Sequence, residues 1–131
     1  MQISTKGRYA LSILIDLANN KQNEYVSLNS ISLRLDKSMK YLEKITSLLV
    51  KNKLIDVSRG KNGGYKLNKD ISKYKLIDIL SLTEKSLLKT KCVENPSSCK
   101  NSCNCKKYKV WVELDNLVYN YLSSVTLKDI L

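Results

Sequence analysis

The most constraining feature of this 131-residue sequence is a hairpin pattern that follows a run of short helical patterns. Residues 54–58 alternate apolar and polar side chains and residues 65–67 alternate again, so each segment is predicted to form a strand. The tip between them, residues 59–64, holds three glycines and two basic residues. We therefore expect a β-hairpin with a cationic tip, in which Gly63 and Gly64 adopt positive φ. A long turn would explain the glycines but not the basic residues.

Helical periodicity precedes the hairpin. Residues 5–19 predict an amphipathic helix with Ser4 as its N-cap. Residues 27–52 predict two short helices with a break at 36–38, the first capped by Ser27 and the second polar and basic on its outer face. Two such helices suit a helix-turn-helix, although a plain helical hairpin with a solvated face has nearly the same pattern. The cationic hairpin behind them favours a winged helix.

The second half of the chain is predicted to contain two more helices and a terminal turn. Residues 72–83 predict a short helix, residues 107–123 a long one, and residues 126–131 a capped terminal turn. The apolar surface of the long helix is wider than a monomer needs, which favours a twofold dimer over docking onto its own domain. The expected fold is mainly α with a small β-hairpin wing. Its parts are a winged helix-turn-helix domain (1–83), a cysteine-bearing loop (84–107), and a dimerisation helix with its tail (108–131), in one compact domain overall.

Charge and composition narrow the function. A formal net charge of +11 suggests a polyanionic partner such as nucleic acid, although a lysine-rich proteome would give the same excess. Because the chain has no histidine, Ser–His and Cys–His catalytic pairs and His-ligated metal sites are excluded, and we expect no enzyme. No apolar stretch approaches the ~18 residues that span a bilayer. Residues 1–8 lack a signal-peptide core, so a cytoplasmic protein without membrane contact is expected.

All four cysteines lie in one polar stretch. They are Cys92, Cys99, Cys103 and Cys105. In the cytosol such thiols are metal ligands or redox groups more often than disulfides. Three interpretations stay open: an iron–sulfur cluster, a thiol switch that works by oxidation, and a zinc site. The spacing of the cysteines does not decide the cluster type.

Five stretches carry a family resemblance. They are residues 3–11 (ISTKGRYAL), 41–43, 54–60, 63–65 and 126–131. Together they resemble the Rrf family of winged-helix regulators, the group of IscR, NsrR and CymR, and most of all its IscR-like iron–sulfur cluster regulators. The resemblance runs the length of the chain. It implies a homodimer that binds double-stranded DNA at a pseudo-palindromic operator, with the long C-terminal helix as the dimer element.

The resemblance also implies which residues contact DNA. Arg59 is expected to enter a minor groove, where narrow A/T-rich tracts attract guanidinium groups. Glu43 is expected to set base preference, because a carboxylate accepts a hydrogen bond from the cytosine amino group. Tyr9 is expected in the core. The other expected DNA-binding residues are Thr5, Lys6, Arg8, Lys40, Tyr41, Lys44, Lys61 and Asn62.

The same resemblance implies a ligand set. With Trp111 giving the register, Cys92, Cys99 and Cys105 match the three family cysteines. Neither known fourth ligand is present, because position 108 is tyrosine and position 8 is arginine. Cys103 is then the candidate fourth ligand, or else a spare or resolving thiol. A 2Fe-2S cluster is preferred over 4Fe-4S, and either over zinc. The alternative is a CymR-like repressor of cysteine or sulfur metabolism, controlled by a cysteine-biosynthetic enzyme partner or by thiol oxidation.

Overall fold

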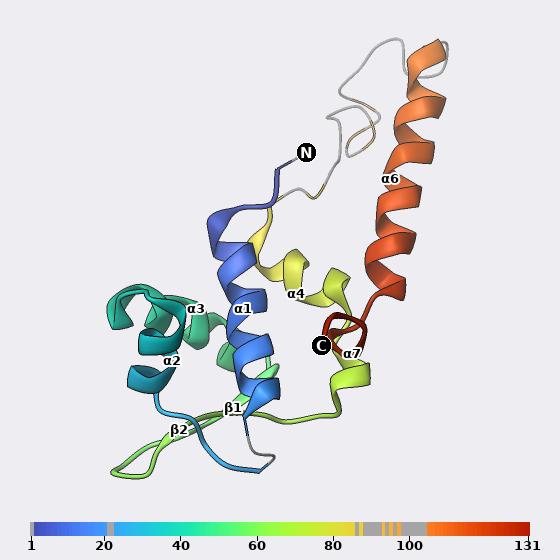
Figure 1. Cartoon of the computed structure of the whole chain (residues 1–131). Helices are drawn as coiled ribbons and strands as arrows, with labels where there is room; N and C mark the ends of the chain where they lie inside the picture. Colours follow the sequence, from blue (N-terminus) through green and yellow to red (C-terminus); the bar gives the residue numbers. More distant parts are fainter. Residues whose placement is uncertain are drawn as a thin grey trace.

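The structure, a computed structural model, describes residues 2–20, 23–85, 87, 93, 95, 97 and 105–131. The elements follow the chain as α1 (Thr5–Asn19), α2 (Leu28–Leu35), α3 (Met39–Lys51), β1 (Ile55–Ser58), β2 (Gly64–Leu67), the 3₁₀ turn η1 (Ile71–Lys73), α4 (Leu76–Thr83), α6 (Lys106–Ser124) and α7 (Leu127–Ile130). The expected fold class, mainly α with a hairpin wing, is confirmed (Figure 1).

Serine caps begin the first three helices. Ser4, Ser27 and Ser38 each accept a hydrogen bond from the backbone N–H three residues later, at 3.0, 3.1 and 3.2 Å. Each cap satisfies an N–H that has no partner within its helix. Between α2 and α3 the chain reverses through Asp36, which lies in the left-handed region at φ 52°. The predicted bounds of α1 and the caps at Ser4 and Ser27 are confirmed.

The wing is an antiparallel pair in which Ile55 faces Leu67 and Ser58 faces Gly64. A third segment joins it, because Val26 and Tyr65 exchange both backbone hydrogen bonds at 2.8 Å. The linker between α1 and α2 thus fixes where the wing sits relative to the helices.

The glycines of the wing are required for different structural reasons. Gly64 has φ 155°, and a Cβ there would collide with the Val26 carbonyl, so the linker approaches the strand only where a side chain is missing. The second positive φ at the tip belongs to Gly60, at 110°. The expectation of positive φ at Gly63 was wrong. Gly63 instead lies against the Ser58 and Gly60 carbonyls inside the turn, which again leaves no room for a Cβ.

The helix predicted at 72–83 begins later than expected. Asp70 caps the short turn η1 by accepting the Ser72 N–H at 2.9 Å, and α4 starts only at Leu76. Between them the backbone is extended, because Lys75 forms a β-bridge with Thr126 from the end of the chain. The pairing of Lys75 with a residue 51 positions later in the sequence (126 − 75) therefore prevents α4 from beginning before Leu76.

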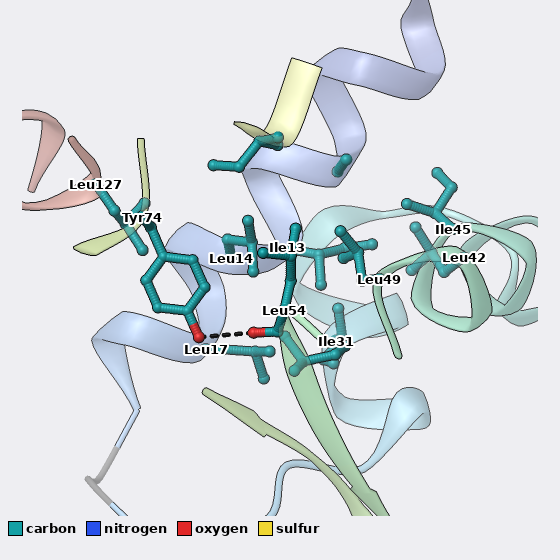
Figure 2. Packing of buried hydrophobic residues seen from close by; sticks show 13 residues of the cluster. Ile13, Leu14, Leu17, Ile31, Leu42, Ile45, Leu49, Leu54, Tyr74 and Leu127 are labelled. Carbon is teal, nitrogen blue, oxygen red and sulfur yellow. Dashed lines mark hydrogen bonds between the residues drawn. The ribbon is translucent and has the colours of Figure 1, made fainter. Parts of the chain in front are cut away.

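The apolar core of the described residues packs around α1 (Figure 2). It is built from α1, α2, α3, β1, α4 and α7 together with Tyr74. The Tyr74 hydroxyl donates to the Leu54 carbonyl at 2.6 Å, so its polar atom is satisfied although the ring is buried. Burial raises the pKa of this phenol. Leu127 of α7 is fully buried in the same core, which ties the end of the described chain to the first helices.

Helix α6 packs against α4 and extends beyond it (Figure 1). It is described in full, and none of its residues is buried. Four large apolar side chains form an exposed stripe at spacings of four, three and four residues: Val110, Leu114, Leu117 and Tyr121. This apolar stripe follows the coiled-coil repeat. No helix in the described ranges is both long and apolar enough to cross a membrane.

Candidate nucleic-acid interface

The outer face of α3 is polar and exposed along its length. It presents Lys40, Glu43, Lys44, Ser47 and Lys51. On the opposite face Leu42, Ile45 and Leu49 are buried, so packing fixes which side chains point outward. A short exposed helix set off by a tight turn has the dimensions of an element that enters a DNA major groove.

An open groove of about 630 Å³ separates α3 from the wing. Glu43, Ser47 and Lys51 line it from α3, and Ser58 and Arg59 line it from the wing. The structure therefore brings Glu43 and Arg59 to one groove from two different elements. A carboxylate there can accept from a base amino group, while a guanidinium can donate to groove acceptors or phosphates.

The wing tip borders a second open groove, of about 480 Å³. Lys61 and Asn62 line it from the tip, and Ser27, Ser30 and Arg34 line it from α2 and its cap. Arg34 is already engaged, since its guanidinium donates to both carboxylate oxygens of Asp16 at 2.7 and 2.8 Å. This bond raises the pKa of Arg34 above its ordinary value. Arg34 therefore joins α2 to α1. Lys61 and Asn62 are exposed and can contact a ligand.

The first turn of α1 supplies a separate polar region. Thr5, Lys6 and Arg8 are exposed, and Arg8 reaches Thr5 Oγ1 at 3.5 Å. None of the three lines either groove at the wing. Polar and basic side chains at a helix start suit contacts to DNA phosphates, which position a protein without reading its sequence.

Two tyrosines link α1 to α3. The rings of Tyr9 and Tyr41 meet edge to face with centroids 5.8 Å apart. Tyr9 is half-buried against the core, and Tyr41 is half-buried as well. The Lys37 ammonium lies 5.2 Å from the Tyr9 ring centre, and its hydrogen bond to Tyr9 raises the pKa of Lys37. Lys37 is a cation at the start of α3 that was not among the expected contacts.

The N-terminus of α1 is joined to the end of α4. Glu84 Oε1 accepts the Ser4 backbone N–H at 3.1 Å and the Ser4 hydroxyl at 2.6 Å, while the Thr83 hydroxyl donates to it at 3.2 Å. Sequence analysis did not identify Glu84. The available signal was Gly7, a residue of low helix propensity within the first turn of a helix.

Of the predicted cluster ligands the structure describes one. Cys105 is a free, half-buried cysteine at the N-cap of α6. Cys92, Cys99 and Cys103 lie outside the described residues. Within the described part of the chain no group of three or more Cys, Asp or Glu side chains is placed to hold a metal ion.

Comparisons with known proteins agree with this architecture. The Rrf2 family, described as an iron-dependent transcriptional regulator, matches residues 3–131. IscR of Photorhabdus laumondii is 33% identical over 130 residues, which cover 99% of this chain and 79% of that protein. The structure of CymR, the global cysteine regulator of B. subtilis, superposes with TM-score 0.82 at 32% identity, covering 99% of this chain and 95% of CymR. IscR of T. potens superposes with TM-score 0.74 at 32% identity, covering 99% and 85%.

Proposed function

Because this chain belongs to the Rrf2 family of transcriptional regulators, we propose that it binds operator DNA as a homodimer and senses iron–sulfur, redox or nitric-oxide status through a cluster on its cysteine loop. Family membership makes it a DNA-binding transcriptional regulator and not an enzyme. The observation that carries the DNA-binding mode is the groove lined by Glu43 and Arg59.

In this proposal α3 enters the major groove, where Glu43, Lys40 and Lys44 face base edges and the phosphates beside them. The wing reaches the neighbouring minor groove with Arg59, and Lys61 and Asn62 extend the same contact. Thr5, Lys6, Arg8 and Tyr41 bind the backbone. Since several cations neutralise phosphates, affinity falls steeply as salt rises.

The proposed dimer uses the apolar stripe of α6. Val110, Leu114, Leu117 and Tyr121 face away from the core, and their spacing matches what an identical helix buries in a coiled-coil seam. A twofold axis there would present two α3 helices to two half-sites, which predicts a pseudo-palindromic operator.

The donor set fits an iron–sulfur cluster. Thiolates are the usual ligands of such clusters, and a chain without histidine offers them as its only soft donors besides methionine. When bound, the cluster supplies a group whose presence depends on iron and oxidants. Cys92, Cys99 and Cys105 would hold it, with Cys103 as the candidate fourth ligand, and we favour 2Fe-2S over 4Fe-4S. The exposed Lys106 and Lys107, next to Cys105, offset the negative charge of a thiolate site.

Replacing Arg59 tests the wing. Arg59→Ala should weaken operator binding roughly 5- to 150-fold, or about 1–3 kcal/mol, because a groove contact is lost. The exposed side chain supports no packing, so the melting temperature should stay unchanged. Fluorescence anisotropy on a cognate duplex measures the loss. Lys73→Ala, which removes another exposed cation, on η1 and away from the wing, is the control. Equal affinity of Arg59→Ala and the wild type would remove the wing assignment.

Anaerobic purification followed by a visible spectrum and iron and sulfide counts tests the cofactor. We expect brown protein with matched iron and sulfide, and a band shape that distinguishes 2Fe-2S from 4Fe-4S. Cys103→Ala should shorten the lifetime of the cluster if Cys103 is the fourth ligand, and leave it unchanged if Cys103 is a spare thiol. Colourless protein that cannot be reconstituted would contradict the cluster.

A second candidate rests on the resemblance to B. subtilis CymR, whose TM-score exceeds that of the T. potens IscR. A CymR-like repressor would respond to a cysteine-biosynthetic enzyme or to thiol oxidation without a cluster. Colourless protein that retains such an enzyme in a pull-down from cysteine-replete cells would favour it. The DNA-binding function is common to both candidates.

A further inference from the structure

The start of α1 is capped by a carboxylate from far along the chain. In an ordinary capping box the N-cap serine accepts the N–H of the third helical residue, whose own Glu or Gln side chain accepts the N-cap N–H. Here Ser4 Oγ accepts the Gly7 N–H at 3.0 Å, but the third helical residue, Gly7, has no side chain. Glu84 takes that place and accepts the Ser4 N–H at 3.1 Å.

Gly7 makes room for this arrangement. A Cβ at Gly7 would collide with Glu84 Oε1 and lie 2.9 Å from Thr83 Oγ1. A side chain at this position, including the glutamate of a local capping box, would displace the remote carboxylate. The glycine and the distant glutamate therefore form one unit, 77 residues apart in the sequence (84 − 7).

Glu84 stands between two functional regions. It is the C-cap of α4, bonded through its own N–H to the Leu80 carbonyl at 2.9 Å, and it is the first residue of the cysteine-bearing segment. The cap it completes begins the turn that presents Thr5, Lys6 and Arg8. A well-capped helix start fixes the directions of the Cα–Cβ bonds from which the side chains of its first turn extend.

We propose that Glu84 is a positioning residue for DNA binding, whose carboxylate holds the first turn of α1 so that Thr5, Lys6 and Arg8 meet the phosphates. The inference rests on the proposed DNA-binding mode and adds to it a residue that itself touches no DNA. It also gives the cysteine-bearing segment a direct connection to the backbone contacts, because that segment starts at the same residue.

A double-mutant cycle on operator affinity tests the proposal. Lys6→Ala should weaken binding in an otherwise wild-type protein. It should also make the negative slope of log K against log salt shallower by about one. In a Glu84→Ala background the same change should cost at least about twofold less, because the contact is already misplaced. Arg59→Ala should cost the same in both backgrounds, since the wing does not depend on Glu84.

Matched variants separate positioning from general stability. Asp129 caps α7 in the same way, accepting the Thr126 N–H and hydroxyl at 2.8 Å each, so Asp129→Ala removes an equivalent cap away from α1. It should leave the salt slope unchanged. Glu84→Gln keeps an acceptor oxygen and should restore most of the affinity lost in Glu84→Ala. If Glu84→Ala does not fold, the cycle is run with Ser4→Ala, which removes the hydroxyl between Glu84 and Gly7.

The proposal would be overturned if the losses of operator affinity in Lys6→Ala and in the Glu84 or Ser4 variant were additive. The Glu84 or Ser4 variant would then also show the same slope of log K against log salt as the wild type. Wild-type protein that binds no operator would instead contradict the proposed DNA-binding mode. The two failures are therefore distinguishable in one titration series.

Discussion

Leu117→Lys should convert the protein to a monomer and weaken binding to a full operator by roughly 100- to 10,000-fold. Leu117 is 68% exposed and lies in the middle of the α6 stripe, so a charge there costs a single chain nothing but has no place in an apolar seam. Two linked half-site contacts gain about 10²–10⁴ in affinity over either alone, and the variant would lose this gain. Light scattering and anisotropy on full and half operators measure both effects.

Tyr119→Lys is the matched control. Tyr119 is 60% exposed on the same helix, but it lies off the stripe, two residues from Leu117 in sequence and therefore turned away from it. It should leave both the mass in solution and the affinity unchanged. A Leu117→Lys protein that remains dimeric with full affinity would show that the stripe is not the interface.

Leu127→Ala should lower the free energy of unfolding by about 2–5 kcal/mol. Leu127 is 0% exposed and packs in the core beside Tyr74, so truncation removes buried methyl groups and leaves a cavity. The backbone around it joins the same core, since the Leu127 N–H donates to the Tyr74 carbonyl at 2.8 Å. Denaturant unfolding followed by circular dichroism gives the value.

Ile130→Ala on the same short helix serves as the comparison. Ile130 is 39% exposed, so it should cost less than half as much. Equal losses for the two variants would mean that α7 stabilises the chain as a helix rather than through the Leu127 side chain.

Local signals predicted the helices that carry their own caps. Ser4 and Ser27 were identifiable as N-caps because each serine comes directly before a segment with helical spacing of apolar residues. The wing was identifiable because two segments of alternating apolar and polar residues flank a glycine-rich turn. The bounds of α1 and the existence of the hairpin follow from residues within a few positions of each other.

Features that depend on distant partners were missed. The late start of α4 comes from the pairing of Lys75 with Thr126, and the cap of α1 from Glu84, neither of which has a local periodicity. At the wing tip the positive φ falls on Gly60 and Gly64, because the contact with Val26 and the shape of the turn decide it. The sequence therefore indicated the right segment and Gly64, but it indicated Gly63 in place of Gly60.

For the candidate site, sequence analysis identified the exposed residues of α3 and the wing but not their shared groove. That Glu43 and Arg59 line one groove is a consequence of how β1 follows α3. Lys37 was not among the predicted contacts, and its contact with the Tyr9 ring has no signal in the sequence. The assigned roles of the DNA contacts and the cysteines stay predictions.

The burial of Leu127 constrains the order in which the protein can fold during synthesis on the ribosome. Residues near the end of the described chain fill the same core as α1, so the nascent chain cannot complete that core until all four cysteines and α6 have been synthesised. Every thiol is thus translated before the DNA-binding half reaches its final packing.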